Sequence, residues 1–123
     1  MRILLVSSRP ASLQAFTVEL RKTPGLVLEQ VGSGEEALAK CRAEAPDLVL
    51  IDDAPAGCTS LGLVQSVLET NAMISTAVVS PLSEAEFHER SEGLGVLTPL
   101  PMEPGPEDAR MLVSRLRGVL GLS

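Results

Sequence analysis

Five short, mainly aliphatic runs recur along this chain, and a stretch with helical spacing follows each of them. The runs are Ile3–Val6, Leu26–Val31, Leu48–Ile51, Ile74–Val79 and Leu94–Leu97. Two of them, Ile3–Val6 and Leu48–Ile51, are apolar throughout, which predicts strands that are buried on both faces. Strands that alternate with crossover helices predict an α/β fold in which helices cover both faces of a parallel sheet. We therefore expect a doubly wound sheet of five strands.

Local signals place the helices between these runs. Ser33 lies three residues before Glu36, a spacing that predicts a capped helix start. A short, mostly polar helix is expected over Ser83–Glu92, with Phe87 as its main apolar anchor. The last helix has its apolar stripe at Ala109, Leu112, Leu116 and Val119. With 123 residues and no visible linker, we expect residues 1–123 to form a single domain.

Negative charge is concentrated in one segment of the sequence. The net charge is −6, which disfavours direct binding to nucleic acid or to anionic lipid. Seven acidic residues and one basic residue lie between Glu84 and Asp108, so this segment carries the whole net charge and the remainder is neutral. The segment is either an ordinary solvated surface or a face for a basic partner.

The sequence also indicates the cellular compartment of the protein. Its longest aliphatic runs, such as Leu48–Ile51, have four residues, far short of the roughly 20 that a membrane span needs. The N-terminus lacks the apolar core of a secretory signal. Cys41 and Cys58 have no metal-like spacing. We therefore expect a cytoplasmic protein that holds no metal.

Polar residues follow three of the five aliphatic runs. Ser7 and Ser8 follow the first run, Asp52 and Asp53 the third, and Ser80 the fourth. In a doubly wound sheet, functional groups gather at the carboxyl ends of the strands. These residues are therefore the candidate site.

In its order of motifs the chain resembles the receiver domain of bacterial response regulators. The similar segments are MRILLVSSRP (Met1–Pro10), VGSGEEAL (Val31–Leu38), PDLVLIDDAPAG (Pro46–Gly57) and GLGVLTPLPM (Gly93–Met102). Together they cover most of the chain at the family's spacing. The resemblance implies a flavodoxin-like fold, with five parallel strands in the order 2-1-3-4-5. It also implies a role in two-component or phosphorelay signalling.

Receiver chemistry needs a particular set of side chains at the carboxyl edge of the sheet. An aspartate accepts the phosphoryl group, and two acids after the first strand hold Mg²⁺, a cation that prefers charged oxygen ligands. The metal and a lysine neutralise the phosphoryl charge during transfer. A Thr or Ser after the fourth strand binds a phosphoryl oxygen and moves with it. An aromatic residue on the fifth strand often moves in response.

This sequence keeps only part of that set. By the resemblance, Asp52 lies at the phosphoacceptor position and Ser80 at the Thr/Ser position. The remaining positions depart from the family: Ser7 and Ser8 replace the acid pair, Arg9 stands where a third acid is common, Asp53 stands where an apolar residue is usual, Leu97 stands at the aromatic position, and Leu100 stands at the lysine position before the matching Pro101.

These departures predict a degenerate receiver, or pseudo-receiver. Hydroxyl groups replace the carboxylates that would hold Mg²⁺, and Leu100 cannot pair with a phosphoryl oxygen. We expect no enzymatic activity, no cofactor and a function in protein–protein interaction. The alternative is a working receiver that uses Mg²⁺ and accepts a phosphoryl group on Asp52 from a histidine kinase.

A partner is expected to dock on the face formed by the fourth helix, the fifth strand and the fifth helix. The candidate residues of this face are Phe87, Leu97, Arg110, Arg115 and Arg117. The partner is another signalling protein or another domain of a longer chain. Because acidic and basic patches would share the face, a homodimer through it is also possible. The alternative is that these charges are ordinary surface charges.

Arg9 allows a specific structural prediction. A buried carboxylate without a cation is costly, and a guanidinium can bridge it with charged hydrogen bonds. We predict that the Arg9 guanidinium lies near Asp52 or Asp53 and supplies positive charge that the site otherwise lacks. The alternative is that Arg9 points into solvent.

Overall fold

The sheet has five parallel strands in the order β2-β1-β3-β4-β5, as predicted. The computed structural model describes residues 1–52 and 59–121, so Asp53 and Cys58 lie outside the described residues. The elements are β1 (Arg2–Val6), a 3₁₀ turn (Pro10–Leu13), α1 (Gln14–Arg21), β2 (Val27–Val31), α2 (Gly34–Ala43), β3 (Leu48–Ile51), α3 (Ser60–Thr70), β4 (Ser75–Val79), α4 (Glu84–Arg90), β5 (Thr98–Leu100) and α5 (Pro106–Leu120).

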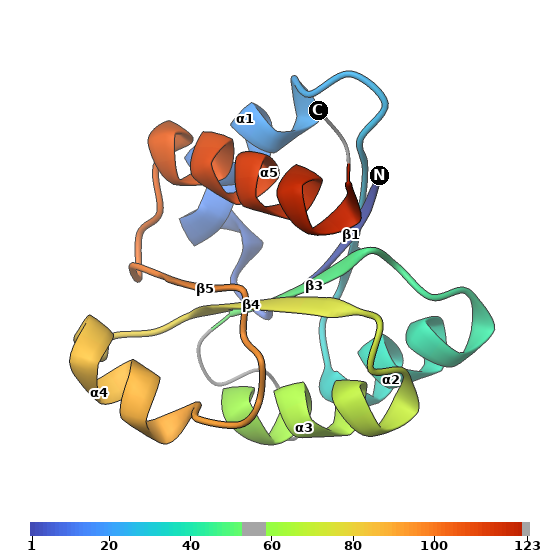
Figure 1. Cartoon of the computed structure of the whole chain (residues 1–123). Coiled ribbons are helices and arrows are strands. Elements are labelled where there is room, and N and C mark those ends of the chain that lie inside the picture. The colour runs from blue at the N-terminus through green and yellow to red at the C-terminus, as the bar shows by residue number, and fades with distance from the viewer. Residues whose placement is uncertain (53–58, 122–123) are drawn as a thin grey trace.

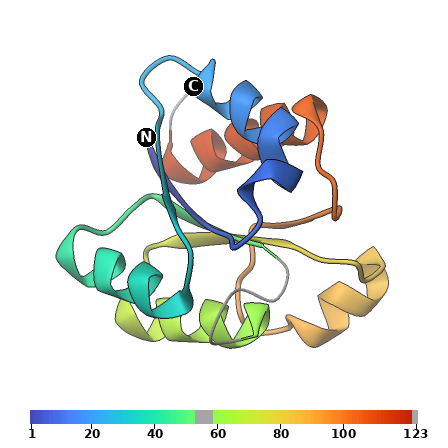
Figure 2. The same ribbon diagram turned by 180° about the vertical axis from the view of Figure 1, so that it is seen from behind.

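Helices cover both faces of this sheet. Helices α1 and α5 lie on one face, and α2, α3 and α4 lie on the other (Figures 1 and 2). The two faces follow from the alternation of side chains along each strand. On β1, Ile3 and Leu5 pack toward α1 and α5, whereas Leu4 and Val6 belong to the core on the opposite face.

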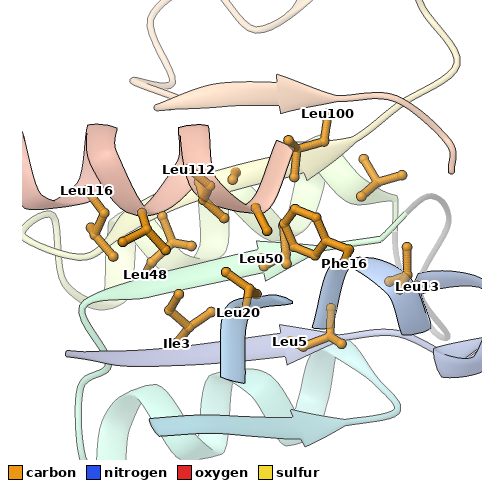
Figure 3. Packing of buried hydrophobic residues seen from close by; sticks show 14 residues of the cluster. Ile3, Leu5, Leu13, Phe16, Leu20, Leu48, Leu50, Leu100, Leu112 and Leu116 are labelled. Atoms are coloured by element: carbon orange, nitrogen blue, oxygen red, sulfur yellow. The ribbon is translucent and has the colours of Figure 1, made fainter. Parts of the chain in front are cut away.

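The core beneath α1 and α5 is aliphatic apart from one ring. Phe16 of α1 packs there with leucines from β3, β5 and α5 (Figure 3). Leu100 belongs to this cluster and is 2% exposed. The residue at the family's lysine position therefore contributes to the core.

Side-chain caps fix the starts of α2, α3 and α4. The Oγ of Ser33 accepts a hydrogen bond from the backbone N–H of Glu36 at 3.2 Å, as its spacing predicts. Ser83 caps α4 in the same way through the N–H of Glu86. Phe87 is the buried residue of α4, which confirms it as the anchor of that helix. In contrast, Val119 of the expected α5 stripe is exposed.

The fifth strand lies later in the sequence than predicted. The expected strand Leu94–Leu97 is wrong, and β5 spans Thr98–Leu100. Gly93 and Gly95 both have positive φ angles, 82° and 65°, so the chain is still turning there. Pro99 lies inside β5, where it pairs in register with Val78. An edge strand tolerates proline because one side of it needs no hydrogen-bond donor.

Within the described residues, none of the helices has the length and apolarity that crossing a membrane requires.

Candidate functional site

The candidate site is centred on Asp52, which directly follows β3 at the carboxyl edge of the sheet. Its carboxylate is only 1% exposed. The backbone N–H of Asp52 donates to the carbonyl of Val6 at 2.9 Å, which extends the pairing of β3 with β1 by one residue. The sheet therefore holds Asp52 next to the loop that follows β1.

Ser7 and Arg9, both from that loop, bind the two oxygens of the Asp52 carboxylate. The Oγ of Ser7 donates to Oδ2 at 2.8 Å, and Nη2 of Arg9 lies 2.8 Å from Oδ1. The same Ser7 oxygen accepts the backbone N–H of Arg9 at 3.0 Å, which fixes the start of the loop. This contact confirms the prediction that Arg9 lies near Asp52. Asp53, the other carboxylate of that prediction, lies outside the described residues.

Arg9 also connects this site to the segment that joins β5 to α5. Its Nη2 donates a longer hydrogen bond, 3.4 Å, to the carbonyl oxygen of Met102. The Arg9 side chain is about one-third exposed, at 34%. One side chain therefore links the loop after β1, the end of β3 and the segment after β5.

The other predicted pocket residues lie apart from this network. Ser8 is exposed, as is Pro101. Ser80 directly follows β4, where its N–H donates to the carbonyl of Leu100 and its Oγ accepts the N–H of Leu82 at 3.2 Å. These hydrogen bonds thus bring together Ser7, Arg9 and Asp52, whereas Ser80 forms a local turn and Leu100 is in the core.

The described side chains at this site do not fit a Mg²⁺ ion. Among the described residues, there is no cluster of three or more His, Cys, Asp or Glu side chains that could hold a metal. Ser7 offers a neutral hydroxyl that already donates to Asp52. The Arg9 guanidinium carries the positive charge that neutralises the carboxylate, and it would repel a second cation.

A second candidate site is the groove between α4 and α5, with a volume of about 510 Å³. Leu97, Phe87 and Val96 contribute apolar surface to it, and His88 and Arg115 contribute polar groups. We refer to it as the α4–α5 groove. Leu97 is half-buried, and Phe87 is 3% exposed and belongs to the core beneath it. The predicted role of Phe87 on a docking surface is therefore limited to supporting the groove from below.

The predicted basic residues of α5 do not share one face. Arg115 lines the α4–α5 groove, but Arg110 and Arg117 line a different groove between α5 and the end of α1. This corrects the expectation that all three arginines lie on the face next to α4. The reason is helical geometry, since residues seven apart lie on one side of a helix and a residue five positions on points elsewhere.

The similarity of this chain to known proteins is detected in its structure and not in its sequence. No protein-family profile matches it, and no curated protein is detectably similar in sequence. A receiver domain protein of CheY type from Methanospirillum hungatei is similar with a TM-score of 0.82 at 21% identity, over 98% of this chain and 96% of that chain. The chemotaxis response regulator CheY4 of Vibrio cholerae gives 0.80 at 20% identity, over 94% and 97%.

A two-component response regulator from Legionella pneumophila is also similar, with a TM-score of 0.77 at 16% identity over 96% of this chain and 98% of that chain. At these identities the likeness establishes the fold. The chain has the flavodoxin-like fold of response-regulator receiver domains, as its motifs predict.

Proposed function

We propose that this protein is a degenerate receiver domain, which acts in two-component or phosphorelay signalling by binding another protein and is not phosphorylated. The observation that carries the proposal is the state of Asp52. Its carboxylate lies at the phosphoacceptor position of the fold, but both oxygens are engaged by Ser7 and Arg9. The domain has no catalytic role and needs no cofactor.

Two features of the site oppose phosphoryl transfer to Asp52. The carboxylate oxygen must attack phosphorus, and a guanidinium 2.8 Å from Oδ1 lowers its nucleophilicity and blocks the approach. The charge that develops on the phosphoryl group also needs a metal and a lysine. Here Ser7 and Ser8 replace the metal-binding acids, and Leu100 is buried in the core.

The α4–α5 groove is the surface that we assign to partner binding. Its apolar residues, such as Leu97, can contact an apolar side chain of a partner, and Glu84, His88 and Arg115 at the groove can orient it through polar contacts. Interfaces of this kind place apolar contacts at the centre and polar contacts at the rim. The partner is a separate signalling protein or another domain of a longer chain.

The proposal is tested with a small phosphodonor and Mg²⁺. We expect acetyl phosphate with Mg²⁺ to leave the intact mass of the protein unchanged. We also expect Mg²⁺ alone to cause no saturable amide shifts around Ser8 and Asp52 at low millimolar concentration. A phosphorylated species that disappears in Asp52→Asn would overturn the proposal and support the working receiver that uses a histidine kinase as donor.

A rebuilt variant makes this test sharper. Ser8→Asp with Leu100→Lys supplies the acid and the lysine that the resemblance assigns to these positions. Phosphorylation of this variant, together with none of the wild-type chain, supports the degenerate assignment. Because Leu100 is a core residue, the folding of the variant is checked by circular dichroism. If it does not fold, Ser8→Asp alone serves in its place, since Ser8 is exposed and lies outside the core.

A further inference from the structure

A basic groove lies between the end of α1 and α5, on the face of the sheet opposite α4. Its volume is about 460 Å³, and its lining includes Val113, which is largely buried, and the hydroxyl-bearing residues Thr23 and Ser114. Arg110 and Arg117 lie along one side of α5, two turns apart, and both line the groove. We refer to it as the α1–α5 groove.

The charges around this groove do not cancel. Glu19 is the acidic residue that contacts Arg110, at 2.9 Å, and it also contacts Lys22 at 3.3 Å. These two cations hold the pKa of Glu19 below its ordinary value, chiefly through the hydrogen bond from Arg110. Within residues 1–52 and 59–121, Arg117 has no ion-pair partner. The groove therefore has net positive charge.

A surface of opposite, negative charge lies on α4 and on the residues just after it. We define the acidic surface as the exposed residues Glu86 and Glu89, three positions apart on α4, together with the exposed Glu92 just after that helix. Of the described residues, no Lys, Arg or His forms an ion pair with any of these three carboxylates. The acidic surface thus belongs to the segment that holds all of the net charge of the chain, and its carboxylates are available to cations of another molecule.

The positions of these two surfaces determine how two copies could meet. Helices α1 and α5, next to which the groove lies, cover one face of the sheet, and α4, which carries most of the acidic surface, covers the other (Figure 1). A molecule therefore cannot bring its own acidic surface to its own groove. A contact between the groove of one copy and the acidic surface of the next uses different patches on the two molecules, which makes it heterologous.

We propose that the α1–α5 groove binds the acidic surface of a second copy of this chain, so that copies associate head to tail. Charge complementarity selects this occupant, because the described residues include both an unpaired cation in the groove, Arg117, and the unpaired carboxylates of the acidic surface. A nucleic acid or an anionic membrane fits less well, since the net charge of −6 repels polyanions. The inference does not depend on whether Asp52 is phosphorylated.

Association of this kind is expected to be weak and sensitive to salt. Exposed charges contribute mainly to encounter rate and register, and ions screen them over about 10 Å at 0.1 M salt. In sedimentation experiments at low ionic strength, we expect the average mass to rise with concentration above the 12.9 kDa of the monomer. At 0.5 M salt, which shortens the screening length to less than about 5 Å, we expect it to return to the monomer value.

Single charge reversals identify the two surfaces. Arg117→Glu breaks no ion pair within the described chain and is expected to weaken association about tenfold at low salt. Glu89→Lys is expected to have the same effect from the other side. Arg42→Glu, an equal change in charge at an exposed position of α2, is the matched control and is expected to leave association unchanged.

Mixing two neutral variants tests the head-to-tail geometry. In a mixture of Arg117→Ala and Glu89→Gln, which introduce no opposite charges that could pair with each other, the intact groove of Glu89→Gln meets the intact acidic surface of Arg117→Ala, so we expect a 1:1 complex that grows no further. Monomeric wild-type protein at low salt would overturn the proposal, as would loss of association in Arg117→Glu but not in Glu89→Lys. Association that is lost only in Arg115→Glu would instead indicate symmetric pairing through the α4–α5 groove.

Discussion

Two arginines flank β1, and their surroundings differ sharply. Arg2 begins the strand and contacts Glu29 at 2.6 Å and Glu44 at 2.9 Å, both of them at the surface. Arg9 follows the strand and contacts Asp52, whose side chain is 1% exposed. The two ends of one strand thus hold the same residue type in two different electrostatic environments.

The burial of the acceptor decides what each contact contributes. Ion pairs between exposed groups add little to stability, because water and salt solvate the separated charges almost as well. When the acceptor is buried, removal of the cation leaves a desolvated charge, and the loss is much larger. The Arg9 contact is therefore the one on which the fold around the candidate site depends.

The largest effect is expected for Arg9→Met. We expect it to lower the free energy of unfolding by about 2–3 kcal/mol at neutral pH, less than for a fully buried pair because Arg9 is partly exposed. Urea unfolding followed by circular dichroism measures this, since the chain has no Trp or Tyr for fluorescence.

A double variant serves as the control for this prediction. Arg9→Met with Asp52→Leu removes both charges together, so no desolvated carboxylate remains. We expect this variant to recover more than half of the loss caused by Arg9→Met. If the double variant is as unstable as the single one, the Asp52 charge is not the source of the loss.

A smaller effect is expected for Ser7→Ala. This change removes the hydrogen bond to Oδ2 of Asp52 and leaves the Arg9 contact in place, so we expect a loss of about 1–2 kcal/mol. Ser8→Ala is the matched control, because Ser8 is the exposed neighbour. It should stay within about 0.5 kcal/mol of the wild-type chain. Equal losses in the two variants would contradict the role assigned to Ser7.

The smallest effect is expected at the other end of β1. Hydrogen bonds from Arg2 and Lys40 hold the pKa of Glu29 below its ordinary value of 4.5. A lowered pKa stabilises the folded chain above pH 4.5, and this contribution is lost as the pH falls through the folded-state value. We expect Glu29→Gln to be slightly less stable than the wild-type chain at pH 7, by less than Ser7→Ala.

Unfolding at a series of pH values checks this prediction. The difference between Glu29→Gln and the wild-type chain should disappear in acid, and at pH 7 it should shrink when salt is added. A difference that persists in acid and in high salt would show that Glu29 contributes through packing, and the contrast between the two arginines would then fail.

The sequence was most informative where neighbouring residues decide the outcome. The aliphatic runs Ile3–Val6 and Leu48–Ile51 predicted β1 and β3 almost to the residue, because an apolar run of that length has to be buried on both faces. The order of motifs gave the strand order and the place of Asp52. It also predicted the Arg9 contact, since a carboxylate at the buried end of a strand needs a cation.

Other features depend on which elements become neighbours, and only the tertiary structure decided them. Strand β5 spans Thr98–Leu100, later than predicted, because the chain is still turning at Gly93 and Gly95. Pro99 can lie inside β5 because an edge strand has a side on which the backbone needs no hydrogen-bond partner. Helical spacing places Arg117 and Arg115 on different sides of α5, and the elements packed against α5 decided which groove each of them lines. Sequence spacing places two residues on a helix, but the neighbours of that helix determine which surface each of them joins.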